Sequence, residues 1–375
     1  MKILMLTTYY YPHISGLTLY FQRLAEEYVK LGHDVTIICA QHDKKLPKRE
    51  NVNGVDVIRT PYILKINKGM ILHKIIFDVW NPLKSADVLH VNLPSVEAMP
   101  TVLLAKLFKK PVASTYVCDI TLPKFIGSKL LDFLIDINHY FVLKLSDKIN
   151  SFTIDFANHS RVLKRFNVKK EIYPIVKLQN KTPITIKRLA DSTRPRIGMA
   201  TRIATDKGIE YMIDALPKIW EKFPDAKLFI VGTVHAVGEE RYFEKLKPLF
   251  DKYAEKIILL GQVEPEAMPY FFKNIDLLVV SSVNSTEAFG MVQVEAMFEG
   301  TSVVATDLPG VRVPVQITGM GDIAKIADSD DLANKIVQVL KKKPAKNEHV
   351  LTTKFDTNSL TKQYLDFYKT AIKSR

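Results

Sequence analysis

NSTEAFGMVQVEAMFEG, residues 284–300, is the stretch of sequence that decides the fold of this chain. Residues 276–280 before it and 302–305 after it are apolar runs that are typical of buried strands. The stretch between them is expected to hold the helix of a β–α–β unit, with Gly300 just past its end. At the start of such a helix, free backbone N–H groups and the positive end of the helix dipole attract anions.

Two carboxylates flank this predicted helix start, Glu287 and Glu295. They suit a ligand with phosphates in its middle and hydroxyls at both ends, as in a sugar nucleotide. Glu287 would then bind sugar hydroxyls, Glu295 the ribose diol, and the amides of residues 289–291 the phosphate oxygens. A surface helix with two solvated acids is the alternative, and the spacing of the two acids does not exclude it.

The sequence around these two acids resembles motifs of a known family. TEAFGMVQVEAM, residues 286–297, resembles the nucleotide-sugar motif of the family 4 retaining glycosyltransferases of GT-B fold. ATDLPGVR, residues 305–312, resembles the loop that follows in that family. The resemblance implies a donor site made by Glu287, Ala288, Phe289, Gly290, Met291, Val292 and Glu295.

A second motif lies earlier, where ATRIATDKG at residues 200–208 resembles the family's diphosphate motif, with Thr201 in place of a glycine. The resemblance implies that Arg202 and Lys207 bind the departing diphosphate. Arginine can fork onto phosphate oxygens and lysine supplies a point charge, so the residue types suit that task. Taken alone, the two residues could equally be surface cations.

The first half of the chain resembles the family more loosely. Its opening strand, loop and helix are typical of a Rossmann-like half. The loop YYYPHISG resembles the family's first loop but has Ser15-Gly16 where the family has two glycines, and Gly16 is implied to lie near the donor phosphates. Val117 stands where most of the family carry a histidine that contacts the transferred sugar. Asp119 is the nearest polar candidate to assist catalysis, beside Arg202, Lys207 and Glu287.

At 375 residues the chain is long enough for two domains. The alternation of strands and helices predicts an α/β fold with parallel sheets, and the resemblance implies two Rossmann-like domains facing across a cleft, as in GT-B enzymes. The expected parts are an acceptor-side domain at 1–178, a linker at 179–195, a nucleotide-sugar-binding domain at 196–352, and a C-terminal helix at 353–375 that packs back on the first domain.

The net charge of +13 fits an anionic membrane surface, a nucleic acid, or a lysine-rich solvated surface. Residues 63–83 mix lysines with large apolar residues, which predicts an amphipathic helix that touches lipid or covers the first sheet. A leader and a long apolar run are missing and only two cysteines occur, so we expect a cytoplasmic protein, with the inner face of the cell membrane as an alternative place.

Together the motifs predict transfer of a sugar, with retention, from a nucleoside-diphosphate sugar to a glycan, lipid-linked or small-molecule hydroxyl acceptor. We expect no cofactor besides this co-substrate, no metal and no nucleic-acid partner. Asp328-Ser329-Asp330 matches a D-x-D metal motif by letter but lies in a polar segment. Another sugar-nucleotide enzyme such as an epimerase, a catalytically weakened binder of sugar nucleotides, and a basic nucleic-acid-binding protein remain as alternatives.

Overall fold

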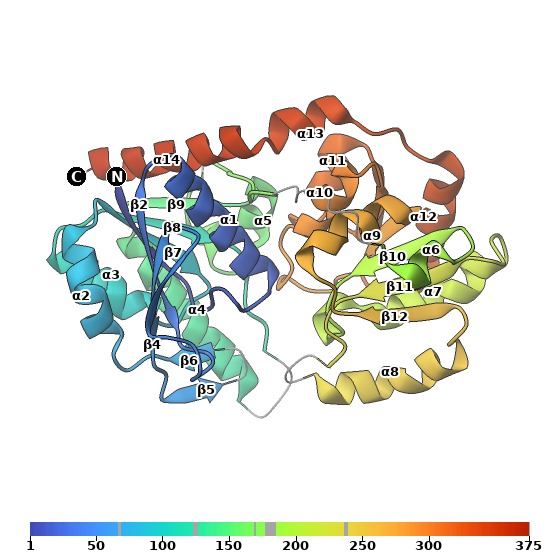
Figure 1. Cartoon of the computed structure of the whole chain (residues 1–375), viewed down its shortest axis with the longest axis horizontal. Helices are drawn as coiled ribbons and strands as arrows, with labels where there is room; N and C mark the ends of the chain where they lie inside the picture. The colour runs from blue at the N-terminus through green and yellow to red at the C-terminus, as the bar shows by residue number, and fades with distance from the viewer. Residues whose placement is uncertain (67–68, 123–126, 169, 177–184, 236–238, 375) are drawn as a thin grey trace. The chain divides into compact units, whose positions relative to one another are not determined.

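The computed structural model describes residues 1–66, 69–122, 127–168, 170–176, 185–235 and 239–374. The chain forms two compact units, unit 1 from Met1–Ile175 with Asp356–Arg375 and unit 2 from Val176–Phe355 (Figure 1). Each unit is built on a largely or wholly parallel sheet, which confirms the predicted α/β fold class. The predicted linker begins among residues 177–184, which lie outside the described residues.

The sheet of unit 1 has the strand order β3-β4-β2-β1-β7-β8-β9 and is parallel except for the β3–β4 pair. Its strands are β1 (Lys2–Leu6), β2 (Asp34–Ala40), β3 (Arg49–Val52), β4 (Val55–Thr60), β7 (Val88–Leu93), β8 (Val112–Tyr116) and β9 (Lys148–Ser151). A separate hairpin is made by β5 (Leu64–Ile66) and β6 (Gly69–Ile71). The helices are α1 (Gly16–Lys30), α2 (Ile75–Ser85), α3 (Ala98–Leu107), α4 (Ser128–Leu145), α5 (Ile154–His159) and α14 (Thr357–Lys373).

Helices cover both faces of this sheet. Crossovers between parallel strands are right-handed, so α1 lies on one face, while α2, α3 and α4 lie on the other. The C-terminal helix α14 packs beside α1 against β7, β8 and β9. There the Tyr368 hydroxyl lies 2.6 Å from Nδ1 of buried His90, and the Tyr364 hydroxyl donates to the carbonyl of Ile172 at 3.1 Å. The end of the chain therefore completes the core of unit 1.

The prediction of an amphipathic helix at residues 63–83 is only partly correct. Leu64–Ile66 and Gly69–Ile71 pair as antiparallel strands, and the helix α2 begins at Ile75. Leu64-Lys65-Ile66 alternates apolar and polar residues, a period of two that suits a strand better than a helix. Within the described parts of the chain, no helix is both long and apolar enough to cross a membrane.

Unit 2 has a wholly parallel sheet in the order β12-β11-β10-β13-β14-β15. Its strands are β10 (Arg196–Ala200), β11 (Lys227–Val231), β12 (Ile257–Gly261), β13 (Leu277–Val280), β14 (Ser302–Thr306) and β15 (Gly321–Ala324). The helices are α6 (Lys187–Ala190), α7 (Ile209–Trp220), α8 (Glu240–Lys252), α9 (Met268–Asn274), α10 (Met291–Phe298), α11 (Val313–Thr318), α12 (Ser329–Lys342) and α13 (Glu348–Lys354).

The strand order of unit 2 shows where a ligand would bind. The chain moves from β10 outward through β11 to β12, and from β13 outward in the opposite direction through β14 to β15. The neighbouring strands β10 and β13 therefore form the topological switch point of the sheet. The loops that leave their carboxyl ends run in opposite directions and leave a crevice between them. These two loops, residues 201–208 and 281–290, contain the two motifs singled out in the sequence.

Candidate active site

Direct contacts hold the two switch-point loops of unit 2 together. The Ser281 hydroxyl donates to the backbone carbonyl of Lys207 at 2.8 Å, and the Val283 N–H donates to the carbonyl of Asp206 at 3.0 Å. Gly208 has a φ of 59°, and a Cβ there would lie 2.3 Å from the Ser281 carbonyl oxygen. Only glycine satisfies both conditions, so this residue allows the close approach of the loops.

Four charged side chains form an ionic cluster across these loops. The Lys207 ammonium lies 2.8 Å from Glu287 Oε2 and 3.1 Å from Asp206 Oδ2. One terminal nitrogen of Arg202 lies 2.8 Å from Asp206 Oδ1. Burial lowers the pKa of Lys207, but the carboxylates of Glu287 and Asp206 outweigh this effect and raise it above its usual value. Lys207 therefore stays charged, although its side chain is only 15% exposed.

The second terminal nitrogen of Arg202, Nη1, is buried and has no hydrogen-bond partner among the described residues. A buried guanidinium N–H without a partner is costly, because such groups are almost always paired in folded proteins. An oxygen of a bound anion would satisfy it, and Arg202 is already oriented by Asp206. The site can therefore accept an anion without reorganising its cations.

Glu287 links the cations to the start of α10. Its Oε2 accepts from Lys207, and its Oε1 accepts from the Gly290 N–H at 2.9 Å. Gly290 has a φ of 73° and precedes the first residue of α10, so the turn needs glycine there. The Gln293 amide donates to the carbonyls of Phe289 and Val311 at 2.9 Å each, which ties this turn to the next loop.

The remaining donor-site candidates lie on the same segment. Ala288 and Phe289 are buried, at 3% and 2% exposure, and contribute backbone and packing at the turn. Met291 and Val292 open α10 and are partly exposed, and Glu295 is partly exposed in its second turn. The structure thus brings Lys207 into contact with Glu287 and joins Arg202 to Lys207 through Asp206. The other predicted residues of this segment lie on the turn after Glu287 and on α10.

Asp206 is a member of the cluster that the sequence motifs did not single out, although it contacts both cations. Its position in the sequence, four residues after Arg202 and directly before Lys207, is the feature that could have indicated that Asp206 belongs to the cluster. Its role depends on the turn at residues 205–207, which the sequence does not specify.

The candidate residues in unit 1, Gly16 and Asp119, lie in different surroundings from each other. Gly16 is the first residue of α1, and the Ser15 hydroxyl caps this helix by accepting from the Thr18 N–H at 3.2 Å. Serine is a favoured residue at this position, which explains physically why it stands beside Gly16. Buried Asp119 accepts hydrogen bonds from the Tyr116 hydroxyl at 3.0 Å and the Ser160 hydroxyl at 2.7 Å.

A third donor, the Arg161 N–H, lies 3.0 Å from the Asp119 carboxylate. Asp119 is only 1% exposed, so its carboxylate is held by protein groups and ties the loop after β8 to the end of α5. A catalytic role for this residue stays a prediction.

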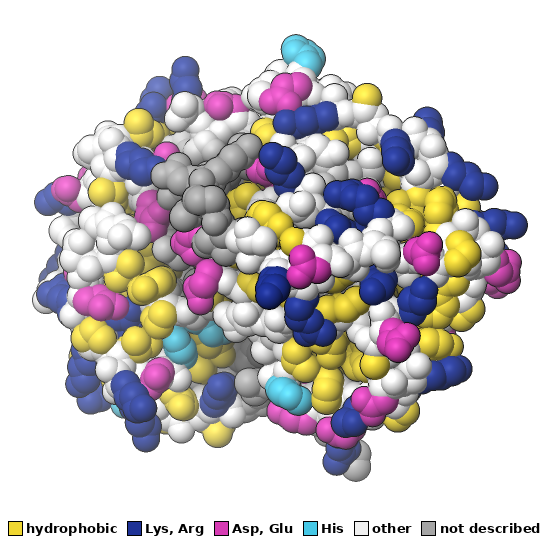
Figure 2. All heavy atoms as spheres, turned by 45° about the vertical axis from the view of Figure 1, so that its right-hand side comes forward, with side chains coloured by type: hydrophobic (Ala, Val, Ile, Leu, Met, Phe, Trp, Pro, Cys, Tyr) yellow, Lys and Arg dark blue, Asp and Glu magenta, His cyan; other side chains and the backbone are white. Residues whose placement is uncertain are grey.

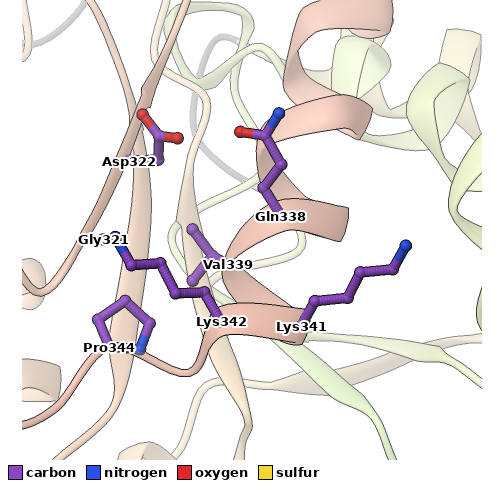
Figure 3. A pocket seen from close by; sticks show the side chains of 7 residues that line it. All are labelled: Gly321, Asp322, Gln338, Val339, Lys341, Lys342 and Pro344. Carbon is purple, nitrogen blue, oxygen red and sulfur yellow. The ribbon is translucent and has the colours of Figure 1, made fainter.

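A surface hollow of about 500 Å³ lies elsewhere in unit 2, lined by residues that include Gly321, Asp322, Lys341 and Lys342 (Figure 3). Gly321 opens β15, so the hollow lies at the amino ends of the parallel strands. The ionic cluster follows the carboxyl ends, at the opposite edge of the sheet. The two lysine side chains diverge in Figure 3 and do not converge on one point. This hollow is therefore separate from the candidate site.

Basic residues do not gather in one stripe on the face of the molecule that Figure 2 shows. Lys and Arg side chains are scattered there, with Asp and Glu between them. Nucleic-acid-binding faces have clustered basic residues, so this face gives no support to the nucleic-acid alternative.

Two family models match the chain. Residues 180–354 match the model for glycosyl transferases group 1, and residues 15–142 match the glycosyl transferase 4-like domain. The chain is a family 4-like glycosyltransferase of GT-B fold. The match to the first model includes the whole ionic cluster and α10, so the candidate site lies within the part of this glycosyltransferase that the group 1 family defines.

The sequence similarity to relatives covers most or nearly all of this glycosyltransferase. An uncharacterized glycosyltransferase of Methanocaldococcus jannaschii is 28% identical over 351 residues, which are 88% of this chain and 87% of that protein. A phosphatidyl-myo-inositol mannosyltransferase of Mycolicibacterium smegmatis is 24% identical over 385 residues, 99% and 94% of the two chains. The solved structure of Anabaena HepE with UDP and glucose has the same fold, with a TM-score of 0.77 at 17% identity over 98% of this chain and 99% of that one.

Proposed function

We propose that this glycosyltransferase moves a sugar from a nucleoside-diphosphate sugar to a lipid-linked or glycan hydroxyl, with retention of anomeric configuration and without a metal ion. The observation that carries the proposal is the ionic cluster, in which Arg202 Nη1 is buried, without a partner among the described residues, beside the charged Lys207. A diphosphate supplies anionic oxygens for both groups.

The cluster explains how the leaving group would be stabilised. As the sugar–phosphate bond breaks, negative charge grows on the diphosphate, and preorganised cations in a water-poor site stabilise such charge strongly. Arg202, Lys207 and the positive start of α10 supply this field, which a divalent metal supplies in other enzymes. Glu287 would exchange its contact with Lys207 for donor hydroxyls, and Glu295 would bind the ribose. Retention is supported by the resemblance to retaining family members.

The proposed acceptor class rests on two separate observations. The mycolicibacterial relative is named for action on phosphatidyl-myo-inositol, a membrane lipid. In addition, α2 exposes Ile76, Phe77 and Trp80, large apolar side chains that suit contact with lipid. We therefore propose that the reaction takes place at a membrane surface, for which the sequence suggested the inner face of the cell membrane.

The first test is a thermal-shift screen with UDP-, GDP-, ADP- and dTDP-sugars, with and without EDTA. A ligand that binds only the folded protein raises its melting temperature. We expect stabilisation by one nucleotide series, unaffected by EDTA, and its loss in the variant Arg202→Gln. Stabilisation that EDTA abolishes would contradict metal independence, and no stabilisation by any member would contradict the donor site.

A catalytically weakened sugar-nucleotide binder is the second candidate, favoured by Val117 in the place of the family's histidine. It shares the donor site but predicts binding without turnover. Release of nucleoside diphosphate from the stabilising donor separates the two candidates. If the site keeps the family geometry, Val117→His should change the rate of this release, and an unchanged rate would mean that unit 1 treats the sugar differently.

A further inference from the structure

Helix α4 carries a stripe of large apolar side chains that the described residues do not cover. The buried members of this 18-residue helix are Ser128, His139, Val142 and Leu143, which define its inner side. Residues at positions 130, 133, 134, 137 and 141 follow helical spacing and lie along one face. The α4 stripe consists of these residues, between 37% and 63% exposed: Leu130, Phe133, Leu134, Ile137 and Phe141.

The neighbouring helices continue this apolar character. α3 packs against both α2 and α4, so the three helices form one layer over a single face of the unit 1 sheet. In this layer α3 exposes Leu107 at 71% and α2 exposes Phe77 at 79%. An apolar surface spread over three adjacent helices is more than the isolated exposed residues of an ordinary protein surface, and such patches mark interaction sites.

The exposed charged side chains of α4 are both positive. The two acids of the helix are engaged with protein groups: Asp136 accepts from the Arg161 side chain at 2.9 Å, and Asp132 accepts from the Leu122 N–H at 3.2 Å. Lys129 and Lys144, near the two ends of the helix, are both exposed. The stripe therefore presents an apolar centre with a cation near each end.

A lysine also lies beside aromatic residues near the end of α2. The Lys84 ammonium lies 5.1 Å from the ring centre of Trp80 and 5.4 Å from that of Phe108. Amphipathic helices that lie in the membrane interface have this composition, with Leu and Phe on one side and lysines that reach anionic headgroups.

A second copy of the chain would fit this face poorly. Two-fold symmetry would set the stripe against itself, and in an antiparallel pairing of α4 helices Lys129 would lie beside Lys144 of the other copy. Like charges brought together at a desolvated contact are unfavourable. An anionic lipid surface instead complements the lysines and covers the apolar side chains.

We propose that the α4 stripe is a membrane-docking surface that inserts into the headgroup boundary of an anionic bilayer. This inference deepens the proposed function, on which it rests for the lipid-linked nature of the acceptor. Docking through the α2–α3–α4 face would hold unit 1 at the surface where such an acceptor resides.

The test is co-sedimentation of the full chain with vesicles of phosphatidylcholine alone and of phosphatidylcholine mixed with phosphatidylglycerol. We expect binding to the anionic vesicles, weakened by added salt, and at least a ten-fold loss of affinity for the double variant Phe133→Ser, Phe141→Ser. Both positions are exposed, so the variant should fold, and its thermal melting curve checks this. The control is Leu31→Ser, which replaces a similarly exposed apolar residue at the end of α1, on the other face of the sheet.

Three results would overturn the inference. They are no binding of the unaltered chain to anionic vesicles, equal binding of the double variant, and a dimer in light scattering that the double variant dissociates, which would assign the stripe to a second copy. The assay contains no donor nucleotide. A failed nucleotide screen would therefore contradict the proposed function without affecting the vesicle result. Failure to bind vesicles would contradict membrane docking without affecting the nucleotide result.

Discussion

Glu287 is bound at both carboxylate oxygens before any ligand arrives, on one side by Lys207 and on the other by the Gly290 amide. In the absence of a donor, this arrangement holds the carboxylate at the helix start, beside Lys207. Preorganisation of this kind matters because a charged group that needs no reorganisation stabilises a transition state more effectively. The cluster is therefore best tested by removing single charges.

Replacing Lys207 by Met keeps most of the side-chain volume and removes the charge. We expect kcat/KM for release of nucleoside diphosphate to fall about 100-fold or more, as for loss of one group that stabilises developing charge. The effect on the melting temperature should be small beside the effect on kcat/KM, because the Gly290 amide still holds Glu287. Lys218→Met, which removes an exposed ion pair to Asp330, is the control. A loss no larger than that of the control would contradict the role of Lys207.

Glu295→Ala tests the proposed ribose contact. The side chain is partly exposed on α10, so its removal should leave the melting temperature nearly unchanged. Affinity for the stabilising nucleotide, measured by titration calorimetry, should fall about ten-fold, the size expected for a charge-assisted hydrogen bond. Glu299→Ala, one turn further along the chain, should retain the original affinity. Equal affinities in the two variants would remove the ribose role of Glu295.

Among the elements of unit 2, the approach of the two switch-point loops depends on Gly208. Its φ of 59°, and the Ser281 carbonyl oxygen only 2.3 Å from where a Cβ would stand, impose two separate penalties on any other residue. Gly32 provides a matched comparison, because its φ is 78° and none of the described atoms lies within 4 Å of its Cβ position. The difference between the two sites isolates the cost of pushing the loops apart.

Gly208→Ala should therefore lower the melting temperature more than Gly32→Ala and should also abolish nucleotide binding. Gly32→Ala should cost only about 1 kcal/mol for backbone strain and should bind nucleotide normally. Thermal melting and nucleotide titration of both variants check this. If both variants bind nucleotide equally well, the close contact between the loops is not required for the site.

Several elements could be predicted from the sequence because their signals are local. The apolar runs around residues 284–300, and the apolar spacing of the last helix, specify β13, α10, β14 and α14. The ionic pair of Lys207 and Glu287 could not be derived from spacing, because 80 residues separate them and only the strand order brings them together. The resemblance to a family, not the physics of the residues, singled out both.

The α4 stripe shows a different limit. Apolar residues occur on both sides of this helix, since Val142 and Leu143 are buried while Phe133 and Phe141 are exposed. Periodicity alone shows that the helix has apolar positions, but which of them face the sheet depends on tertiary packing. Hairpin β5–β6 was missed for a related reason, because the apolar residues on either side of it also fit a helix.

For the protein as a whole, two buried histidines of unit 1 make stability depend on pH. Burial lowers the pKa of His90 to about 3 and that of His139 to about 4. In the unfolded chain each has a pKa of about 6.5, so the unfolded state binds more protons below that pH. The free energy of unfolding should therefore fall as pH drops from about 6.5 to about 4, by up to about 1.4 kcal/mol per pH unit for each histidine.

Urea denaturation across this pH range measures the slope. The variant His139→Gln keeps an acceptor for the Ser95 N–H, which lies 3.2 Å from His139 Nε2, but cannot be protonated. Its slope should be shallower than that of the unaltered chain, while stability near neutral pH falls only modestly. An unchanged slope would mean that the pKa of His139 in the folded protein is close to its value in the unfolded chain.

The place of α14 has a consequence for how the protein is made. Unit 2 is continuous in sequence, so every part of it has been synthesised once residue 355 leaves the ribosome. Unit 1 starts first but lacks the Tyr364 and Tyr368 rings that cover Tyr20, Tyr28 and His90 until the residues that follow unit 2 emerge. The half of the chain that is translated first is thus the half that finishes folding last, and a nascent chain would carry an unfinished unit 1 throughout the synthesis of unit 2.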